Sequence, residues 1–437
     1  MKKKSHYNIF AEWRGFRCGI NLMTGKKVVL LPDEYRMYTE NPESLSNEIY
    51  RALVDGGFLL DEDADEYARL VHRRNSDVFY NNNTFKLTVL PTLECNFHCW
   101  YCYEKHIQGN ICSSGNIDRV KKYVDYIINH NPIFNFHLDW FGGEPLLYYY
   151  DAVKPISEYI KSACQRNGLS FVNSMTTNCF PADKDMIEDF ARIGLDRFQI
   201  TLDGSREKHN MVRFEKRGDD SYARILENIN TICRTVPDCM VNIRINYTND
   251  NIKGISGIVN DIEPDNRSRV YFSLQRVWQT NSSENDKEIE ETVNFEIEAI
   301  RAQGIEVQYD SIVCGCGIRC YADSMQESVV NFDGNLYKCT ARDFAKHQGI
   351  VGRLDEDGIP QWNDNYYKYC MKPIFDNSKC RECIYVPVCL GTCSQKYVEN
   401  GVEAIMAECR PEEYEQTIQE DLYRTLYNHI NNAIHSR

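Results

Sequence analysis

Cys95-Asn-Phe-His-Cys99-Trp-Tyr-Cys102 is the stretch that decides how this chain folds and what it can bind. It follows an apolar, strand-like run that begins at Phe85. Three thiolates at spacings of four and three residues can each ligate a different iron of a 4Fe-4S cube, which leaves one iron without a nearby protein ligand. A distant fourth ligand is the alternative to an open position. We favour the open position, and predict a cluster at Cys95, Cys99 and Cys102 that keeps one iron free for a small molecule.

A zinc site is the alternative use of these cysteines. Zinc ribbons pair two Cys-x2-Cys hooks, and no second hook follows Cys99 and Cys102 at the usual spacing. His98 and His106 are the nearby candidates for a fourth zinc ligand. The spacing therefore favours a cluster over zinc.

Composition limits the class of protein. A chain of 437 residues predicts two or three domains. With 50 basic and 64 acidic residues, a formal net charge of −14 argues against nucleic acid as a partner. The first residues lack the apolar core of a secretory signal, and no segment predicts a membrane span, so we expect a cytoplasmic protein with no membrane partner. In such a chain, 19 cysteines indicate metal or redox chemistry rather than disulfides.

Strand and helix patterns alternate from about residue 84 to 310. Six strands separated by helices predict parallel βαβ units, and six units are two short of a closed eightfold barrel. We therefore predict an α/β fold, a partial (β/α)6 TIM barrel, whose chemistry lies at the carboxyl ends of its strands. The expected strands are 85–90, 135–141, 170–176, 197–202, 241–247 and 270–274, and the expected helices are 116–130, 151–166, 183–192, 221–234, 251–260 and 286–303.

Smaller domains are expected on either side of the barrel. Short strands at 7–13, 16–22 and 27–31 precede helical patterns at 42–53 and 63–74. This order resembles the winged-helix element that binds leader peptides in many peptide-modifying enzymes; a plain N-terminal extension is the alternative. The last third is rich in Cys, Gly, Asp and Asn, which predicts a loop-rich, metal-ordered segment before a terminal helix at 411–434. The predicted domains are 1–82, 83–305 and 306–437.

With the aromatic Tyr101 before its last cysteine, the motif Cys95-x3-Cys99-x2-Cys102 resembles the signature of the radical SAM superfamily, and the resemblance extends over essentially the whole chain. In that superfamily the open iron chelates S-adenosylmethionine, and one electron releases methionine and a 5'-deoxyadenosyl radical that abstracts hydrogen from the substrate. The protein binds and orients the cofactor and the substrate, and it shields the radical. The resemblance therefore implies an enzyme with S-adenosylmethionine as cofactor.

Further motifs of the superfamily follow later strands. Gly142-Gly143-Glu144-Pro145 resembles the GGEP motif, in which two glycines allow close approach to the methionine ammonium and the glutamate adds a negative partner. Thr176-Thr-Asn178 resembles the TNG segment, with Cys179 where glycine is usual, which weakens a specific contact there. Asp203-Gly204, His209 and Arg213 resemble a DG…H…R run; Asp203 is expected to accept a ribose hydroxyl and Arg213 to pair with the methionine carboxylate, with Arg244 as its competitor. The expected cofactor-binding residues are Tyr101, Gly142, Gly143, Glu144, Pro145, Asn178, Asp203 and Arg213.

A second cysteine pattern lies near the C-terminus. It consists of Cys320-x13-Gly334-x4-Cys339, then Cys380-x2-Cys383-x5-Cys389-x3-Cys393, and finally Cys409. This spacing resembles the seven-cysteine SPASM pattern, which carries auxiliary clusters. Because eight thiolates would fully ligate two cubes, one more ligand is expected upstream; Cys314 is our choice and Cys316 its rival. Zinc at the Cys-x2-Cys hook is the alternative for the second site. The resemblance assigns Cys314, Cys320, Cys339 and Cys393 to one auxiliary cluster and Cys380, Cys383, Cys389 and Cys409 to another, which makes three 4Fe-4S clusters in all.

SPASM enzymes mostly modify peptides. We expect a maturase that installs a thioether or carbon–carbon crosslink in a ribosomally made precursor, with its leader held by the N-terminal domain and a reductant such as flavodoxin or ferredoxin as a second partner. An anaerobic sulfatase maturase that forms formylglycine is the alternative. In that family an aspartate follows the cysteine that matches Cys339, whereas here Thr340 follows it and the next aspartate is Asp343. An iron–sulfur electron carrier or a metal-stabilised peptide-binding module is the non-enzyme alternative.

Overall fold

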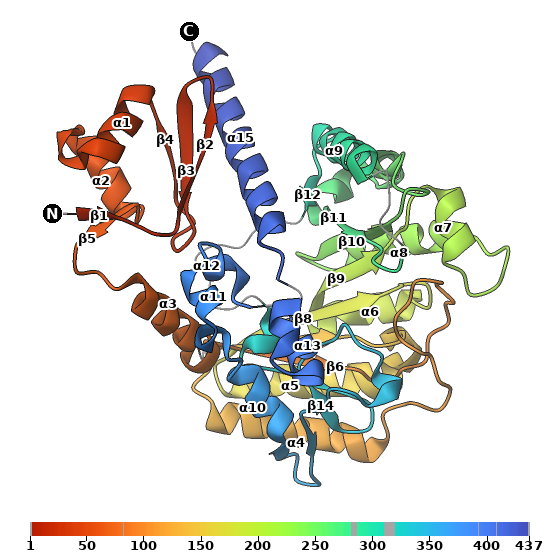
Figure 1. Ribbon diagram of the computed structural model, residues 1–437. Helices are drawn as coiled ribbons and strands as arrows, with labels where there is room; N and C mark the ends of the chain where they lie inside the picture. Colours follow the sequence, from red (N-terminus) through yellow and green to blue (C-terminus); the bar gives the residue numbers. More distant parts are fainter. Residues whose placement is uncertain are drawn as a thin grey trace. The chain divides into compact units, whose positions relative to one another are not determined.

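The computed structural model describes residues 2–81, 83–280, 286–309, 320–391, 393–407 and 409–435. The chain divides into two compact units (Figure 1). Unit 1 contains residues 1–81, 310–325 and 367–437, and unit 2 contains residues 82–309 and 326–366. The domain boundaries expected from the sequence stay predictions. Within the described residues, no helix combines the length and apolar character that crossing a membrane requires.

Unit 2 is built on an 11-stranded, mostly parallel sheet with the order β12-β11-β10-β9-β8-β7-β6-β13-β14-β15-β16. The six expected strands are confirmed, each within two residues at either end, and they lie side by side in chain order. Their bounds are β6 (Thr84–Val89), β7 (Asn135–Trp140), β8 (Ser170–Thr177), β9 (Leu195–Thr201), β10 (Met240–Tyr247) and β11 (Val270–Arg276). The α/β prediction is therefore correct.

Helices connect successive parallel strands, and Figure 1 shows α4, α5 and α6 along one side of the sheet. Amphipathic patterns account for them, since one face of each helix is buried. Where a helix was expected at 251–260, the chain forms a 3-10 segment, Ile255–Asp261. The helices of unit 2 are α4 (Ser114–His130), α5 (Lys154–Arg166), α6 (Lys184–Ile193), α7 (Arg206–Val212), α8 (Ser221–Thr235) and α9 (Asp286–Ala302).

The sheet extends beyond the six predicted strands at both edges. β12 (Glu306–Gln308) pairs with β11, and β13 (Glu327–Val330) pairs in parallel with β6. The expectation that the chain after residue 306 is loop-rich missed these strands, because strands of three or four residues carry too little alternation to be recognised. An antiparallel series completes this edge: β14 (Asn335–Tyr337), β15 (Gly352–Leu354) and β16 (Pro360–Trp362).

Unit 1 contains a three-stranded antiparallel sheet, formed by β2 (Asn8–Trp13), β3 (Phe16–Asn21) and β4 (Lys27–Leu30), as the strand patterns predicted. β1 (Lys2–Lys4) and β5 (Leu59–Asp61) form a separate pair. The helix expected from residue 42 begins instead at Asn47, because Ser46 caps it by accepting from the Ile49 amide at 3.4 Å. The helices here are α1 (Pro32–Glu40), α2 (Asn47–Asp55) and α3 (Glu66–Asn75).

The C-terminal helix α15 (Pro411–His435) packs on this small sheet. Ile20 and Leu22 share one apolar cluster with Leu422 and Leu426, and all four are buried. At the rim, Lys27 Nζ lies 2.5 Å from a carboxylate oxygen of Asp421. The N-terminal sheet and the C-terminal segment therefore share one core. Five shorter helices precede α15 in the chain: α10 (Asp364–Cys370), α11 (Ser378–Glu382), α12 (Val386–Cys389), α13 (Ser394–Asn400) and α14 (Glu403–Ala407).

Candidate functional site

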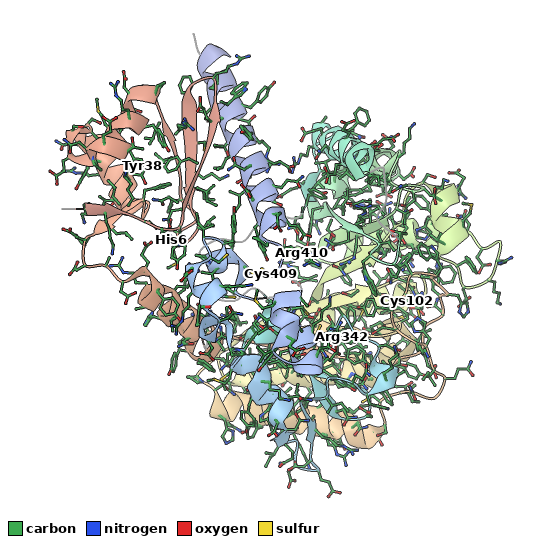
Figure 2. The ribbon with its side chains drawn as sticks, in the orientation of Figure 1. His6, Tyr38, Cys102, Arg342, Cys409 and Arg410 are labelled. Carbon is green, nitrogen blue, oxygen red and sulfur yellow. The ribbon has the colours of Figure 1, made fainter. Side chains whose placement is uncertain are left out.

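The three cysteines of the first motif lie on the loop that follows β6. Cys95 and Cys99 are partly buried and Cys102 is exposed; Figure 2 labels Cys102. Burial raises the pKa of all three thiols, that of Cys102 to about 11, and the charge of Cys99 raises the pKa of the other two. The three sulfurs are thus near enough to interact. The structure places the three predicted ligands on one loop, and a cluster there stays a prediction.

The zinc alternative for this loop finds little support in the geometry. His106 Nε2 lies 3.5 Å from Cys102 Sγ, while its Nδ1 contacts the Leu93 carbonyl at 3.1 Å. Zinc would need four ligands within about 2.3 Å of one point. In the part of the chain that the structure describes, no three Cys, His, Asp or Glu side chains converge on a single-ion position. A cube spreads its thiolate ligands over separate irons, so this all-thiolate set fits a cluster.

Gly142 and Gly143 bring the turn after β7 against the cysteine loop. A Cβ on Gly143 would lie 2.0 Å from the Glu94 carbonyl oxygen, and one on Gly142 would lie 2.8 Å from Leu90 Cγ. The Glu144 amide donates to the same Glu94 carbonyl at 2.7 Å. The two glycines therefore allow one backbone to lie directly against the residue that precedes Cys95. Pro145, also buried, begins the short 3-10 turn that follows.

Glu144 is fully buried, and both of its carboxylate oxygens accept hydrogen bonds from the protein. Oε1 accepts from Thr177 Oγ1 at 2.6 Å and from the Leu146 amide at 3.0 Å, and Oε2 accepts from the Asn178 amide at 2.7 Å. Burial raises the pKa of Glu144, although these hydrogen bonds favour its charged form. The side chain thus ties the ends of β7 and β8 together. Its predicted contact with the methionine ammonium stays a prediction.

Asn178 reaches the cysteine loop from the end of β8. Its Nδ2 donates to Asn96 Oδ1 at 2.8 Å and lies 3.8 Å from Cys95 Sγ. The next residue, Cys179, is buried and has φ +61°, a left-handed conformation that favours glycine. The unusual cysteine therefore keeps the backbone shape that a glycine would give, and Asn178 stays beside the cluster loop.

Tyr101, Asp203 and Arg213 meet at one point. The Tyr101 hydroxyl donates to the Asp203 carboxylate, Arg213 Nη1 donates to the Tyr101 oxygen at 2.5 Å, and Arg213 lies 3.5 Å from Asp203. Asp203 is fully buried and Arg213 nearly so. The competing Arg244 has its Nε bonded to Asn246 Oδ1 at 3.0 Å. Arg213 therefore bonds directly to the cysteine loop through Tyr101, and which arginine pairs with the cofactor's carboxylate stays a prediction.

Two further residues complete this cluster. The Asn246 amide donates to Asp203 Oδ1 at 2.9 Å, and its side chain lies 3.4 Å from the Tyr101 hydroxyl. His209 Nδ1 accepts from the Asp203 amide at 3.1 Å. Burial and the Arg213 charge hold the pKa of His209 well below its ordinary value, so its ring is neutral. The sequence analysis missed Asn246, although its place at the carboxyl end of the fifth strand was a usable signal.

The side of the sheet away from the helices is polar, which the sequence analysis also missed. Lys86 and Asp139 lie 3.7 Å apart, Ser174 Oγ donates to Asp139 Oδ1 at 2.6 Å, and His137 Nε2 contacts Ser174 Oγ at 2.9 Å. Alternation along each strand separates these side chains from the apolar ones that face the helices. A closed barrel would fill this side with branched apolar residues. These partly buried polar residues would instead suit a polar ligand.

Asp343 lies beside the chain that leaves the cysteine loop. Its Oδ1 accepts from the Lys105 amide at 3.3 Å, and Tyr103 Oη donates to the Thr340 carbonyl at 3.2 Å. Burial, with the charge of Asp343, raises the pKa of Glu104 to about 8. Although no aspartate follows Cys339 directly, a carboxylate three residues beyond Thr340 therefore reaches this region.

Four of the C-terminal cysteines gather within unit 1, among them Cys409, labelled in Figure 2. Cys389 and Cys409 both raise the pKa of Cys380 and Cys383, so the four sulfurs lie close enough for their charges to interact. Their assignment as the four ligands of one auxiliary cluster stays a prediction. For the other predicted auxiliary cluster, Cys314 and its rival Cys316 fall outside the described residues, and Cys320, Cys339 and Cys393 are divided between the two units.

Comparison with known proteins identifies the central segment. Residues 89–261 match the radical SAM superfamily. The serine-type anaerobic sulfatase-maturating enzyme of Bacteroides thetaiotaomicron is 24% identical over 153 residues, which is 32% of this chain and 34% of that enzyme. The chain thus spans about a third of the length of that relative. The cysteine-type enzyme of Clostridium novyi is 23% identical over 335 residues, 70% of this chain and 86% of that enzyme.

Solved structures show the same fold. Native anSMEcpe with bound AdoMet superposes with a TM-score of 0.57 at 17% identity, covering 80% of this chain and all of that one. SuiB of Streptococcus suis superposes with a TM-score of 0.51 at 14% identity and covers 94% of this chain and 97% of its own. These matches show that the chain shares the fold of both structures, and its residues 89–261 are the segment that matches the radical SAM superfamily.

Proposed function

We propose that this protein is a radical SAM enzyme that oxidises a peptide and joins two of its side chains by a thioether or carbon–carbon bond. Bound at Cys95, Cys99 and Cys102, the cluster would supply the electron that cleaves S-adenosylmethionine to methionine and a 5'-deoxyadenosyl radical. The observation that carries this proposal is the convergence of Asn178, Arg213 and the Gly142–Pro145 turn on the loop that holds these three cysteines.

The residues around the loop have separate tasks in this mechanism. Asn178 and Asn96 orient the loop beside Cys95, and Glu144 fixes the strand end that carries Asn178. Arg213 is the cation available at the loop for the cofactor's carboxylate, and it is held by Tyr101 and Asp203. A guanidinium that is already positioned loses little conformational freedom when it binds a carboxylate.

Two features support a peptide as the substrate. The polar side of the sheet, with Lys86, Asp139 and His137, offers hydrogen-bonding partners for peptide groups. The N-terminal sheet has outer strands β2 and β4, each paired on one side only among the described residues, to which an extended leader could add a strand. SuiB, whose fold covers 94% of this chain, has been crystallised with its precursor peptide SuiA.

Formylglycine formation is the second candidate, favoured by the similarity to sulfatase-maturating enzymes and by the carboxylate of Asp343 near the cysteine loop. Two auxiliary clusters, a leader peptide and a small reductant protein belong to the crosslinking proposal. The four cysteines of unit 1 support one of these clusters. SuiB superposes on 94% of this chain and anSMEcpe on 80%, and this wider match to SuiB supports the binding of a leader peptide.

The two candidates are separated by one anaerobic incubation. Reconstituted protein, S-adenosylmethionine and dithionite are mixed with the Cp18Cys peptide, which has been crystallised with anSMEcpe. The crosslinking proposal expects 5'-deoxyadenosine without an aldehyde on the peptide. An aldehyde, trapped with a hydrazide and located by mass spectrometry, would make the protein a formylglycine-forming enzyme. Absence of 5'-deoxyadenosine under all conditions would refute both.

A further inference from the structure

An open cavity of about 440 Å³ lies on the outer side of the cysteine loop. Two of its lining residues, His98 and Trp100, come from the loop itself, and the rest come from the end of α7 and the residues after it, including Met211, Phe214 and Arg217. His98 and Trp100 are the two neighbours of Cys99 in the chain. The cavity therefore adjoins the segment of the loop that carries Cys99.

The cavity is separate from the cofactor residues already described. Tyr101 points to Asp203 and Arg213 and is partly buried there. Its neighbour Trp100 is 55% exposed and stands edge-on to it, with an interplanar angle of 85°. The loop thus presents one aromatic ring to the interior, where the cofactor would lie, and another to the surface.

The chemistry of the lining is that of a protein-binding surface. Trp100 and Met211, which is 63% exposed, are large apolar side chains of the types enriched at interfaces. The lining includes Arg217 and His98 and no carboxylate, although the whole chain has a net charge of −14. An acidic partner would therefore meet less repulsion at this cavity than over an average part of the surface.

We propose that this cavity is the docking site of a small acidic flavin protein of the flavodoxin class, which delivers the electron that radical formation needs. The inference rests on the proposed function, because only a cluster that must be reduced requires such a donor. In the transfer, the reduced flavin loses one electron and the cluster at Cys95, Cys99 and Cys102 gains it. The exposed indole and thioether suit the apolar edge of a flavin, and Arg217 suits the acidic surface around it.

The test compares two reductants on the same reconstituted protein. Arg217→Glu and Met211→Asp are each assayed for 5'-deoxyadenosine with flavodoxin and its reductase, and separately with dithionite, which needs no docking site. We expect the flavodoxin-driven rate to fall about tenfold and the dithionite-driven rate to stay at the wild-type value. Arg166→Glu, an exposed charge reversal at the end of α5, is the matched control and should leave both rates unchanged.

A binding measurement gives a second readout that does not depend on turnover. Flavodoxin binding followed by calorimetry should weaken in Arg217→Glu and with rising salt, since screening removes the charge contribution. Equal flavodoxin-driven rates and affinities in variant and wild type would overturn the docking site, as would a loss that appears only when ferredoxin replaces flavodoxin. An equal fall of both rates would place the cavity in the radical machinery instead. Absence of dithionite-driven cleavage in wild type would refute the proposed function, a separate outcome.

Discussion

Arg213 Nη1 donates to the hydroxyl oxygen of Tyr101 at 2.5 Å, and this contact joins the residue after α7 to the loop that holds the three cysteines. Arg213 is buried and Tyr101 is partly buried beside Asp203, whose carboxylate lies 3.5 Å from the guanidinium. The ion pair of Arg213 and Asp203 depends on both residues, because either one alone would be a buried, unpaired charge.

Arg213→Ala should therefore lower the free energy of unfolding by about 3 kcal/mol. Urea denaturation of the protein before cluster reconstitution measures this. The double variant Arg213→Met/Asp203→Asn removes both charges and should recover part of the loss. If Asp203→Asn cost as much stability without Arg213 as it does in the wild type, the two residues would not act as a pair.

Gly143→Ala should destabilise unit 2 by about 2 kcal/mol or more, because its Cβ would lie 2.0 Å from the Glu94 carbonyl oxygen. The same variant should retain less iron after reconstitution, since Glu94 directly precedes Cys95. Gly257→Ala is the control: no atom lies within 4 Å of its added Cβ. Equal thermal midpoints for the two variants would show that the turn does not depend on this close approach.

Leu422→Ala should loosen the N-terminal sheet, although the residue is far away in the sequence. Leu422 is fully buried in the cluster it shares with Ile20 and Leu22, so its truncation should cost about 2–5 kcal/mol. Hydrogen exchange should rise in β2 and β3. Tyr423→Ala, at a position 46% exposed on the same helix, should leave exchange there unchanged. Faster exchange confined to α15 would refute a shared core.

This shared core also bears on tests of leader binding. Deleting residues 1–80 would expose the apolar surface of Leu422 and Leu426, so loss of peptide processing in such a truncation would not report on the leader site. A proline at Val28, on the outer strand β4, changes the edge and keeps Leu422 and Leu426 covered, although Val28 itself packs against the cluster around Leu30. We expect Val28→Pro to weaken peptide binding without affecting cleavage of S-adenosylmethionine in the absence of peptide.

Acid should remove the contribution that the Asp220 charge makes to the stability of the folded protein. Its hydrogen bond with Arg206, and further bonds to Asn210 and the Ala223 amide at the start of α8, lower its pKa to about 2. An unfolded aspartate titrates near pH 3.9, so this contribution is present above that pH and is lost as the pH falls toward 2. The difference in thermal midpoint between wild type and Asp220→Asn should shrink over this range. A constant difference would show that the Asp220 charge does not contribute.

The sequence was sufficient for the parallel strands and for the cysteine loop, because both depend on local patterns: alternating strands and helices, and ligands a few residues apart. It was insufficient where partners lie far apart in the chain. Nothing in the pattern around Glu144 shows that Thr177 and Asn178 satisfy its carboxylate, and nothing near Ile20 shows that Leu422 covers it. Those contacts follow from how the elements pack.

The glycines of the Gly142–Pro145 turn illustrate the difference. From the sequence they were expected to admit the cofactor closely. In the structure each is also required by the approach of Leu90 and Glu94, so the turn and the cysteine loop support each other before any cofactor binds. Short strands such as β13 and the antiparallel strands after it were missed for a simpler reason: three or four residues do not show a periodicity.

Reductive cleavage of S-adenosylmethionine is the most direct measure of the central claim. Protein reconstituted anaerobically with iron and sulfide is incubated with S-adenosylmethionine and dithionite, and 5'-deoxyadenosine is quantified for wild type, Cys99→Ala and the control Cys164→Ala, a cysteine buried in α5 away from the loop. We predict product from wild type and Cys164→Ala and none from Cys99→Ala. Product from Cys99→Ala at the wild-type rate, or none from wild-type protein that holds its iron, would contradict the account.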